Sequence, residues 1–396
     1  MENTLIPSDP NRDPNTGSDP ERACRVGLSA CLEIGSRRFQ ALFEHFGSAQ
    51  AIWKAPLAAL QTQLKPALAE KIFAHCSQTD PQALLTRVLA QGYQICLRED
   101  PHYPAWLASI HDPPFILYWF GNAECWGHLD RALAIVGTRQ ATPYGLEQAR
   151  RLAREWSALG MTVVSGLATG IDTAAHQGVL EAQGRTVAVL GTGLDKISPA
   201  AKRGLAREIA REGLVISEYP PGFGGARWSF PLRNRIISGL SQGVLVVEAG
   251  EKSGALITSD AATEQGREVM ALPGPISSPQ SAGPHALLKE GAALITSTGD
   301  MLEVMGWTAH FESHFKPDLK ASDLPIGLTN DENDVYLVLS EMPQPIEVLA
   351  QEIEWPISQL LTILTQLELK GLVQQWPGSR YLRSGSAAHQ RHHFQQ

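Results

Sequence analysis

The sequence predicts an α/β fold with a parallel sheet at its centre. Between residues 132 and 274, six short apolar runs alternate with stretches that have helical periodicity. The runs are apolar almost throughout, as expected of strands that are buried on both faces. Strands that alternate with helices of about 10–15 residues form parallel βαβ units. These two observations fix the predicted fold class.

Length and composition set the broad limits. With 396 residues, of which 43% are hydrophobic and 19% charged, the chain is expected to form two or three globular domains. No apolar run is long enough to span a bilayer, so we expect no membrane association. The five cysteines are scattered and form no C-x-x-C pair, which predicts buried thiols in a reducing cytoplasm and no metal site.

The N-terminal part is expected to be helical after a tail. Residues 1–22 are rich in Pro, Asn, Asp and Ser and are predicted to be disordered, and residues 23–96 are predicted to form short helices. Within them Phe39, Leu42 and Phe46 share one helix face that Gly47 closes. The stretch that follows, DPHYPAWLASIHDPPFILYWFGN, is rich in Pro and aromatic residues. We expect it to pack as an irregular lid.

The central block carries the strands and helices of the predicted sheet in alternation. Its helical segments include residues 145–159 and 198–210. The six predicted strands cover residues 132–137, 161–166, 186–191, 214–217, 243–249 and 267–274.

A small C-terminal unit is predicted after a linker over residues 308–327. Residues 328–384 show three helical segments and two short strands, which is the outline of a winged helix, and residues 385–396 form a tail. The stretch 328–383 holds eight acidic residues against three basic ones. A winged helix that enters a DNA groove needs cations on its recognition helix. This unit is therefore predicted to contact protein, either a second copy or a partner.

Glycine-rich loops follow four of the predicted strands. They lie at Gly137–Arg139, Ser165–Gly170, Gly191–Gly193 and Glu251–Thr258. The carboxyl ends of parallel strands lie along one edge of a sheet, so these loops should converge on one crevice. Glycine allows a ligand to approach the backbone, and the free amides at helix starts favour phosphate. The sequence predicts a phosphate-binding crevice, with the Thr169 and Gly170 amides among its donors.

Three acid–base candidates lie near these loops. Asp172 and His176 are four residues apart and could form a catalytic pair, although a carboxylate that satisfies amides at a helix start is the favoured interpretation. Glu248 ends a predicted strand and could activate water, or it could pair with an arginine and order the crevice, which we favour. There is neither a G-x-G-x-x-G motif after the first strand nor a G-x-x-x-x-G-K-[ST] motif. No catalytic residue is assigned.

A cationic segment lies after the fourth predicted strand. The net charge of the chain is −8, yet residues 219–247 contain no Asp or Glu and include Arg227, Arg233 and Arg235. Trp228 and Phe230 offer flat faces beside them. Cations with stacking platforms hold single strands without reading their sequence. Alternatively the aromatic residues belong to the core and the arginines to a solvated face. We favour single-strand binding.

Six motifs in order resemble the DNA-processing protein A family, also called DprA or Smf. They are AIVGTRQATPYG, SGLATGIDTAAH, SEYPPG, FPLRNRIISGLS, VVEAGEKSGALIT and GREVMALPG. The resemblance covers residues 100–305. It implies a Rossmann-like DNA-binding domain over residues 97–307, with a lead-in extension, between an N-terminal domain of the SAM or helix-hairpin-helix type and the winged-helix-like domain.

The resemblance also implies a function. Proteins of this family are non-enzymatic mediators that bind single-stranded DNA, protect incoming strands in natural transformation, help displace single-strand-binding protein and load the RecA recombinase. They act as homodimers and no cofactor is expected. The strand-binding candidates, taken from the motif positions and from the loops and cationic segment above, are Gly137, Arg139, Gly166, Thr169, Gly170, Arg227, Phe230, Arg233, Asn234, Arg235, Lys252 and Ser253.

Two positions depart from the family pattern. Ile197-Ser198 stands where a Tyr before Pro is usual, and His285 stands where an Asn is usual. The alternative function is a Rossmann-like enzyme that releases the base from a nucleoside monophosphate. Such enzymes resemble one another in a PGGxGT loop, and the nearest stretch here, PPGFGG, lacks the following Thr.

Overall fold

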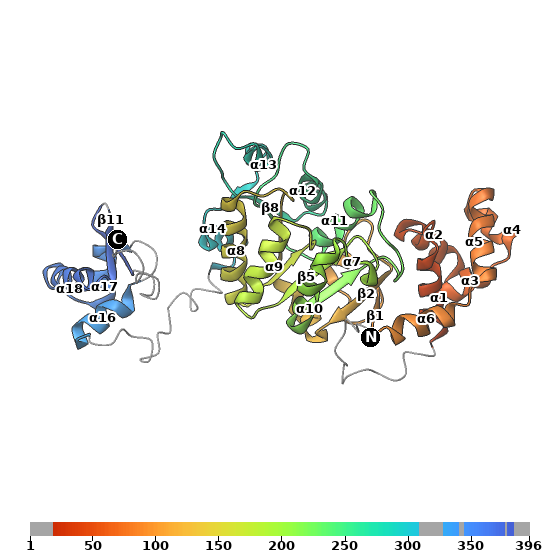
Figure 1. The fold of residues 1–396 in the computed structure, drawn as a ribbon, viewed down its shortest axis with the longest axis horizontal. Coiled ribbons are helices and arrows are strands. Elements are labelled where there is room, and N and C mark those ends of the chain that lie inside the picture. The colour runs from red at the N-terminus through yellow and green to blue at the C-terminus, as the bar shows by residue number, and fades with distance from the viewer. Residues whose placement is uncertain (1–18, 309–327, 340–343, 377, 384–396) are drawn as a thin grey trace. The chain divides into compact units, whose positions relative to one another are not determined.

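The computed structural model describes residues 19–308, 328–339, 344–376 and 378–383. The chain divides into two compact units, residues 1–308 and 309–396 (Figure 1). Most of both predicted tails and of the linker lies outside the described residues. Within the described ranges, every helix is too short or too polar to cross a bilayer.

The first unit begins with a cluster of helices. Asp19 caps the first of them by accepting hydrogen bonds from the Glu21 and Arg22 amides, so the predicted tail is wrong over residues 19–22. The second helix ends at Gly47, whose φ of 80° allows the left-handed turn that the sequence predicted. The cluster comprises α1 (Pro20–Ala30), α2 (Ser36–Phe46), α3 (Ala49–Lys54), α4 (Leu57–Gln63), α5 (Pro66–Gln78) and α6 (Pro81–Ala90).

A nine-stranded sheet forms the core, in the order β1-β2-β6-β5-β4-β3-β7-β8-β9. The seven strands from β6 to β9 in this order are parallel. Each of the six predicted runs forms a different one of these strands, and β9 is the seventh. The bounds are β1 (Gln94–Leu97), β2 (Ile116–Gly121), β3 (Ala132–Val136), β4 (Thr162–Ser165), β5 (Thr186–Leu190), β6 (Leu214–Ser217), β7 (Gly243–Val246), β8 (Glu268–Ala271) and β9 (Ala293–Leu294).

The lead-in stretch is part of the sheet and is not an irregular lid. It contains the buried strand β2, which pairs antiparallel with β6 on one side and with β1 on the other. The predicted domain boundary after residue 96 falls inside β1. The first unit is therefore a single body in which the strand after the N-terminal helices extends the parallel sheet.

Helices cover both faces of the sheet. Ala206 and Ile209 of α10 pack with Ala188 and Val215 on one face, and Ile236 of α11 packs with Val187 and Val189 on the other. This arrangement follows from right-handed crossovers that run outward in both directions from β3 and β7. The helices are α7 (Ala105–Ala108), α8 (Pro143–Ala158), α9 (Ile171–Glu181), α10 (Arg203–Glu212), α11 (Ser229–Gly239), α12 (Gly254–Glu264), α13 (Ala282–Lys289) and α14 (Thr298–Val304).

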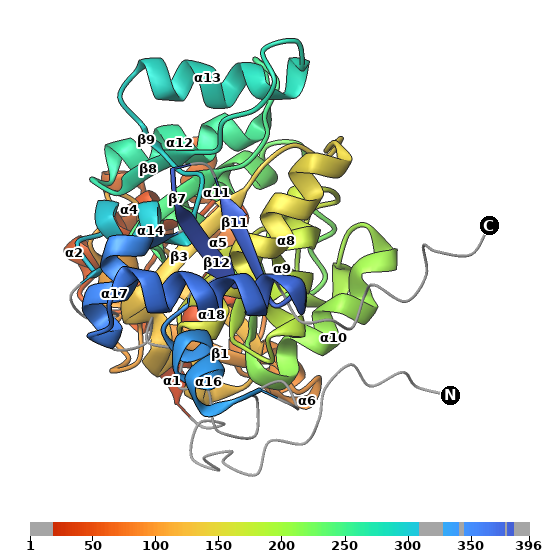
Figure 2. The same cartoon turned by 90° about the vertical axis from the view of Figure 1, so that its left-hand side faces the viewer.

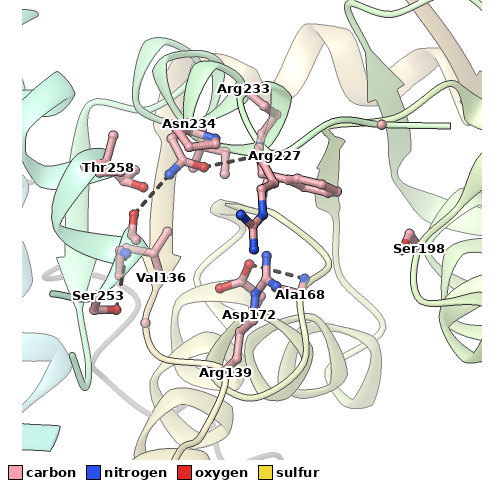
Figure 3. Close-up of a pocket in the computed structure, with 18 of the residues that line it drawn as sticks. Val136, Arg139, Ala168, Asp172, Ser198, Arg227, Arg233, Asn234, Ser253 and Thr258 are labelled. Carbon is pink, nitrogen blue, oxygen red and sulfur yellow. Dashed lines mark hydrogen bonds between the residues drawn. The ribbon is translucent and has the colours of Figure 1, made fainter. Parts of the chain in front are cut away.

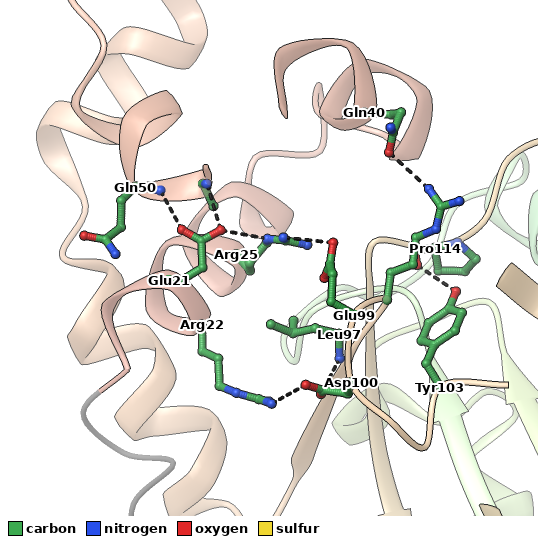
Figure 4. A network of polar contacts seen from close by, with 12 residues as sticks. Glu21, Arg22, Arg25, Gln40, Gln50, Leu97, Glu99, Asp100, Tyr103 and Pro114 are labelled. Atoms are coloured by element: carbon green, nitrogen blue, oxygen red, sulfur yellow. Dashed lines mark hydrogen bonds and ion pairs between the residues drawn. The ribbon is translucent and has the colours of Figure 1, made fainter. Parts of the chain in front are cut away.

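Polar contacts fasten the N-terminal helices to the sheet domain (Figure 4). Arg25 is 2% exposed, and its guanidinium lies over the rings of both Phe39 and Phe43. Its guanidinium group bonds Glu21 at 3.2 Å and Glu99 at 3.1 Å. Ser29 Oγ lies 2.5 Å from the Tyr118 hydroxyl on β2. Because the two regions also share one apolar cluster, the helices are held in a fixed place beside the sheet.

The second unit is a winged helix (Figure 2). Three helices enclose an apolar core that includes Leu349, Leu360 and Leu364, and Lys370 pairs with the buried Glu332 at 2.6 Å. A short strand that the sequence did not reveal joins the predicted hairpin. The elements are α16 (Asn330–Val338), β10 (Gln344–Pro345), α17 (Ile346–Ile353), α18 (Ile357–Leu369), β11 (Val373–Trp376) and β12 (Arg380–Arg383).

Candidate nucleic-acid interface

The sheet reverses its strand order between β3 and β7, and a pocket opens at this point. The chain continues from β3 to β6 in one direction and from β7 to β9 in the other, so the loops after β3 and β7 part and leave a crevice. The pocket has a volume of about 570 Å³. Its walls come from the loops after β3, β4, β6 and β7 and from helices α9, α11 and α12, with Ser198 added from the segment after β5 (Figure 3).

Three arginines from two segments line this pocket. Arg139 follows β3, Arg227 precedes α11, and Arg233 lies within α11. Arg139 and Arg227 are exposed, and neither has an ion-pair partner in the part of the chain that the structure describes. The Arg139 guanidinium lies 5.8 Å from the centre of the Phe230 ring, which is half-buried in the same wall. The pocket therefore joins free positive charge to an aromatic surface.

Arg233 forms the floor of the pocket. It is 5% exposed, and its guanidinium donates to the carbonyls of Gly166, at 2.8 Å, and of Val189, and to Asn234 Oδ1 at 3.2 Å. Burial lowers the pKa of Arg233 to about 10, and the charge of Asp172 opposes this effect. Arg233 therefore stays charged at neutral pH. Asn234 in turn donates to the Gly254 carbonyl at 3.1 Å, which ties α11 to α12.

Asp172 holds the loop after β4 in shape. One of its carboxylate oxygens accepts hydrogen bonds from the amides of Gly166, at 3.2 Å, and Ala168, at 3.3 Å. Burial raises the pKa of Asp172, while Arg233 and these amides counter the shift. The expectation that this carboxylate satisfies backbone amides holds, but those amides belong to the loop before α9, and the first turn of α9 has no side-chain cap.

His176 is not the catalytic partner of Asp172. Its ring is fully buried, and Nδ1 lies 2.7 Å from Thr186 Oγ1 on β5. Burial, with a smaller contribution from the nearby cations Lys202 and Arg233, lowers the pKa of His176 to about 3. His176 is thus a neutral core residue at physiological pH.

Glycines allow the close approaches that shape the crevice. Gly170 has a φ of +86°, and a Cβ there would lie 2.3 Å from the Thr138 carbonyl oxygen. A Cβ on Gly166 would lie 2.6 Å from the Arg233 guanidinium. The amide and carbonyl of Gly166 are both in use, so this residue makes room for Arg233 instead of offering a free donor. Gly137 lines the pocket beside Val136.

The structure brings most, but not all, of the predicted site residues together. Thr169, Gly170 and Lys252 lie outside the pocket lining, whereas Ser253 lies in it and caps α12 by accepting from the Ala255 amide at 3.3 Å. Three of the four glycine loops line the pocket. The fourth lies behind it, because Gly191 packs against Phe230. The candidates in the lining are Gly137, Arg139, Arg227, Phe230, Arg233, Asn234 and Ser253.

Arg235 is wrongly placed by the sequence prediction. It points away from the pocket, and its guanidinium pairs with Glu218 at 2.6 Å and with Asp112 at 3.4 Å. Ser36 of the N-terminal helices lies 3.4 Å from the same group. Residues two apart on a helix are separated by about 200°, so Arg233 and Arg235 cannot face the same crevice.

Glu248 also differs from the expectation. It does not pair with an arginine: its carboxylate accepts from the Thr142 amide at 2.8 Å and from the Thr142 hydroxyl at 2.6 Å. A Cβ on Gly145 would lie 2.2 Å from this carboxylate. Glu248 therefore anchors the start of α8 and orders the loop after β3, and it does not line the pocket.

Several lining residues were not predicted. Ala168, Ala226, Pro231 and Ile257 are small or apolar, so no chemical signal marks them in the sequence. Ser198 lies in the lining at the first departure from the family pattern. At the second departure, His285 Nε2 lies 3.0 Å from the Gly274 carbonyl oxygen, away from this pocket.

The fold and the site define a Rossmann-like α/β protein with an arginine-lined crevice at the switch point of its sheet, joined to a winged helix. The chain belongs to the DprA/Smf family: a family model described as DNA recombination-mediator protein A matches residues 94–306, and a DprA winged helix domain matches residues 320–379. The predicted family and fold are confirmed.

Individual relatives extend the match over almost the whole chain. Protein Smf of Synechocystis is 36% identical over 92% of this chain and 100% of its own length. DNA processing protein DprA of Bacillus subtilis is 44% identical over 55% of this chain and 75% of its own. The X-ray structure of DNA processing protein A from Streptococcus pneumoniae, at 35% identity, superimposes with a TM-score of 0.61 over 70% of this chain and 95% of that one.

Proposed function

We propose that the crevice binds single-stranded DNA through its sugar-phosphate backbone, with little sequence preference. The observation that carries this proposal is the meeting of Arg139, Arg227 and Arg233 around one pocket in a protein of net charge −8. Overall repulsion of polyanions makes such a local cluster the place where phosphate can bind. Phe230 adds a half-buried ring on which a base can stack.

The same geometry argues for binding without catalysis. Of the acid–base candidates, Asp172 and Glu248 accept hydrogen bonds from backbone amides or from Thr142. His176 is fully buried, with Nδ1 on Thr186, and burial keeps its Nε2, which has no partner among the described residues, out of reach of a substrate. A general base needs a free lone pair within reach of the substrate. The alternative function, release of a base from a nucleoside monophosphate, finds no support in these contacts.

Membership of the family supports a more specific role. We propose that the protein is a non-enzymatic recombination mediator in the cytoplasm. It would protect incoming single strands during natural transformation, help displace single-strand-binding protein and load the RecA recombinase. We further propose that it acts as a homodimer and needs neither cofactor nor metal. These roles rest on the resemblance of the sequence to the family, and RecA-dependent strand exchange on coated DNA would test them.

Filter binding of single- and double-stranded oligonucleotides across a range of salt concentrations tests the binding function. We expect tight binding to single strands and much weaker binding to blunt duplex. If the three crevice arginines contact phosphates, log Kobs should fall with log salt with a slope of about −2. Protein that ignores single strands but releases free base from nucleoside monophosphates would overturn the proposal.

A further inference from the structure

A second surface with exposed apolar side chains lies where the N-terminal helices meet the sheet domain. Trp228 and Leu232 project from the start of α11, and Leu32 faces them from the loop after α1. The three side chains are 48%, 49% and 47% exposed and line one shallow groove, which we call the Trp228 groove. A contiguous patch of exposed large apolar side chains is typical of a binding surface.

The Trp228 ring is held rigidly at this surface. Its centre lies 6.0 Å from the Tyr219 ring and 5.8 Å from the Phe223 ring. Tyr219 is buried and stacks on Phe223 at 4.7 Å, so the aromatic cluster is anchored to the core. A fixed ring with one face in solvent loses little entropy when a base stacks on it.

The Trp228 groove is continuous with the arginine-lined crevice. Trp228 directly follows Arg227, which lines the crevice. Gly224 lines both the crevice and a neighbouring hollow, and Leu32 lines both that hollow and the Trp228 groove. A polymer held in the crevice can therefore pass over the loop before α11 into the groove without leaving the protein surface.

Cations lie at the far end of the groove. Ser36 and Asp112 line the groove and also the next hollow, which includes Arg37 and Arg38 at the start of α2. Arg37 is 71% exposed, and its nearest carboxylate among the described residues, that of Asp112, lies at 4.0 Å.

The carboxylates of the groove do not leave it acidic. Glu218 and Asp112 share the buried guanidinium of Arg235, and Asp112 also lies 4.0 Å from Arg37, so two guanidinium groups balance the two carboxylates. A polyanion in the groove would therefore meet the exposed arginines of α2 with little opposing repulsion.

We propose that a single strand bound in the crevice continues into the Trp228 groove, where a base stacks on Trp228 and the next phosphates meet Arg37 and Arg38. This inference rests on the proposed function. It makes the N-terminal helices part of the DNA site, and it predicts a footprint longer than the crevice alone can hold.

Binding of two oligonucleotide lengths tests the inference. A strand of about 6 nucleotides should fill the crevice, and one of about 20 should also reach the groove. We expect Trp228→Ala to weaken binding of the longer strand roughly tenfold and that of the shorter strand less than twofold. Trp228→Phe keeps a ring and should restore most of the affinity. Trp106→Ala is a matched control, because Trp106 is 37% exposed on α7 and lines none of these hollows.

A second variant does not depend on the aromatic cluster. Changing Arg37 and Arg38 together to Ala should reduce the salt slope of the longer strand by about 1.4 and leave that of the shorter strand unchanged. Thermal unfolding of each variant establishes that it is folded.

The outcomes separate this inference from the proposed function. If both variants bind the longer strand with full affinity, DNA does not enter the Trp228 groove, and the surface would instead be assigned to a protein partner. Equal losses for both lengths would assign Trp228 to the crevice and also overturn a separate subsite. Failure of the unaltered protein to bind either strand would instead defeat the proposed function.

Discussion

Helix α11 carries one arginine on each of two sides, and the two differ in the groups that surround the guanidinium. On the crevice side, Arg233 donates to main-chain carbonyls and to Asn234, and among the described residues the carboxylate that acts on it is that of Asp172. On the other side, Arg235 pairs with two carboxylates, those of Glu218 and Asp112. Carbonyl dipoles hold a guanidinium without cancelling its charge, whereas ion pairs remove its field.

Arginines that are close together in the sequence therefore do not necessarily form one cationic surface in the folded protein. Arg235 fastens the N-terminal helices to the sheet domain, where Ser36 and Glu218 also meet at 2.7 Å. Arg233 supports the floor of the crevice, with Arg139 and Arg227 above it. Substitutions on one side of α11 at a time test this difference.

Arg233→Ala should have the largest effect. We expect a loss of single-strand affinity of at least about 100-fold and a fall in the free energy of unfolding of about 3 kcal/mol, because the change leaves the buried Asp172 without its main counter-charge. Oligonucleotide titration and urea denaturation measure the two effects. Arg233→Lys keeps the charge but not the forked contacts and should recover binding only in part. Unchanged affinity in Arg233→Ala would move the site elsewhere.

Arg235→Ala should reverse this pattern. It removes the partner of Glu218 and Asp112, so the free energy of unfolding should fall by about 2 kcal/mol. Binding of a strand of about 6 nucleotides, which the crevice alone holds, should change less than twofold. Glu218→Gln tests the same ion pair from its other end and should have a smaller effect of the same kind. A weakened short-strand affinity in either stable variant would show that the two sides of α11 are not independent.

The pH dependence of the free energy of unfolding tests the burial of His176 on α9. The pKa of His176 falls from 6.5 to about 3 on folding because the ring is buried. The folded state therefore binds fewer protons, and the stability present above pH 6.5 is lost as the pH falls toward 3. Between pH 7 and pH 5 this histidine should account for about 2 kcal/mol. His176→Asn keeps an N–H donor near Thr186 Oγ1, whose own proton goes to the Val163 carbonyl, and should flatten this part of the profile in urea titrations. An equally steep profile in the variant would assign the acid sensitivity to other groups.

Exposed crevice arginines should show a smaller effect than Arg233. Arg139→Ala and Arg227→Ala each remove one phosphate contact, so each should reduce the salt slope by about 0.7 and leave the unfolding free energy within about 0.5 kcal/mol of its original value. The exposed Arg207 on α10 lines no part of the crevice and provides a matched control. A variant that weakens binding without changing the slope would show that the lost contact is not to phosphate.

Removal of residues 309–396 should have the smallest effect on single-strand binding. The winged helix is a separate compact unit, and its helix α18 carries no Lys or Arg. We therefore expect residues 1–308 to keep their affinity for single strands within about twofold in the same titration. A large loss would assign a direct DNA contact to the winged helix and contradict the prediction that it contacts protein.

Much of the architecture could be predicted because burial leaves a periodic signature. Six of the seven parallel strands are short and almost entirely apolar, and the Gly47 helix end is a local feature. The strands β1 and β2 were missed because the prolines and aromatic residues around them resemble loop composition. The pairing of β2 with β6 depends on residues about 100 positions later, which no local pattern reveals.

The site was predicted as a class and not in its details. Convergence of the loops follows from parallel topology, so Arg139, Arg233 and Ser253 were brought together as expected. The partner of Glu248 is Thr142 and not an arginine, because it depends on which helix start lies within about 3 Å of the carboxylate.

The sequence by itself determined the parallel α/β core, the edge at which the crevice opens and the kinds of residue that surround it, since these depend on short-range periodicity and chain order. Which arginine faces the crevice was settled only by contacts in the folded protein. That outcome depends on neighbours far away in the chain: Asp112 and Glu218 neutralise Arg235, while the Gly166 and Val189 carbonyls hold Arg233. Electrostatic fields depend on distance and burial, which a linear sequence does not contain.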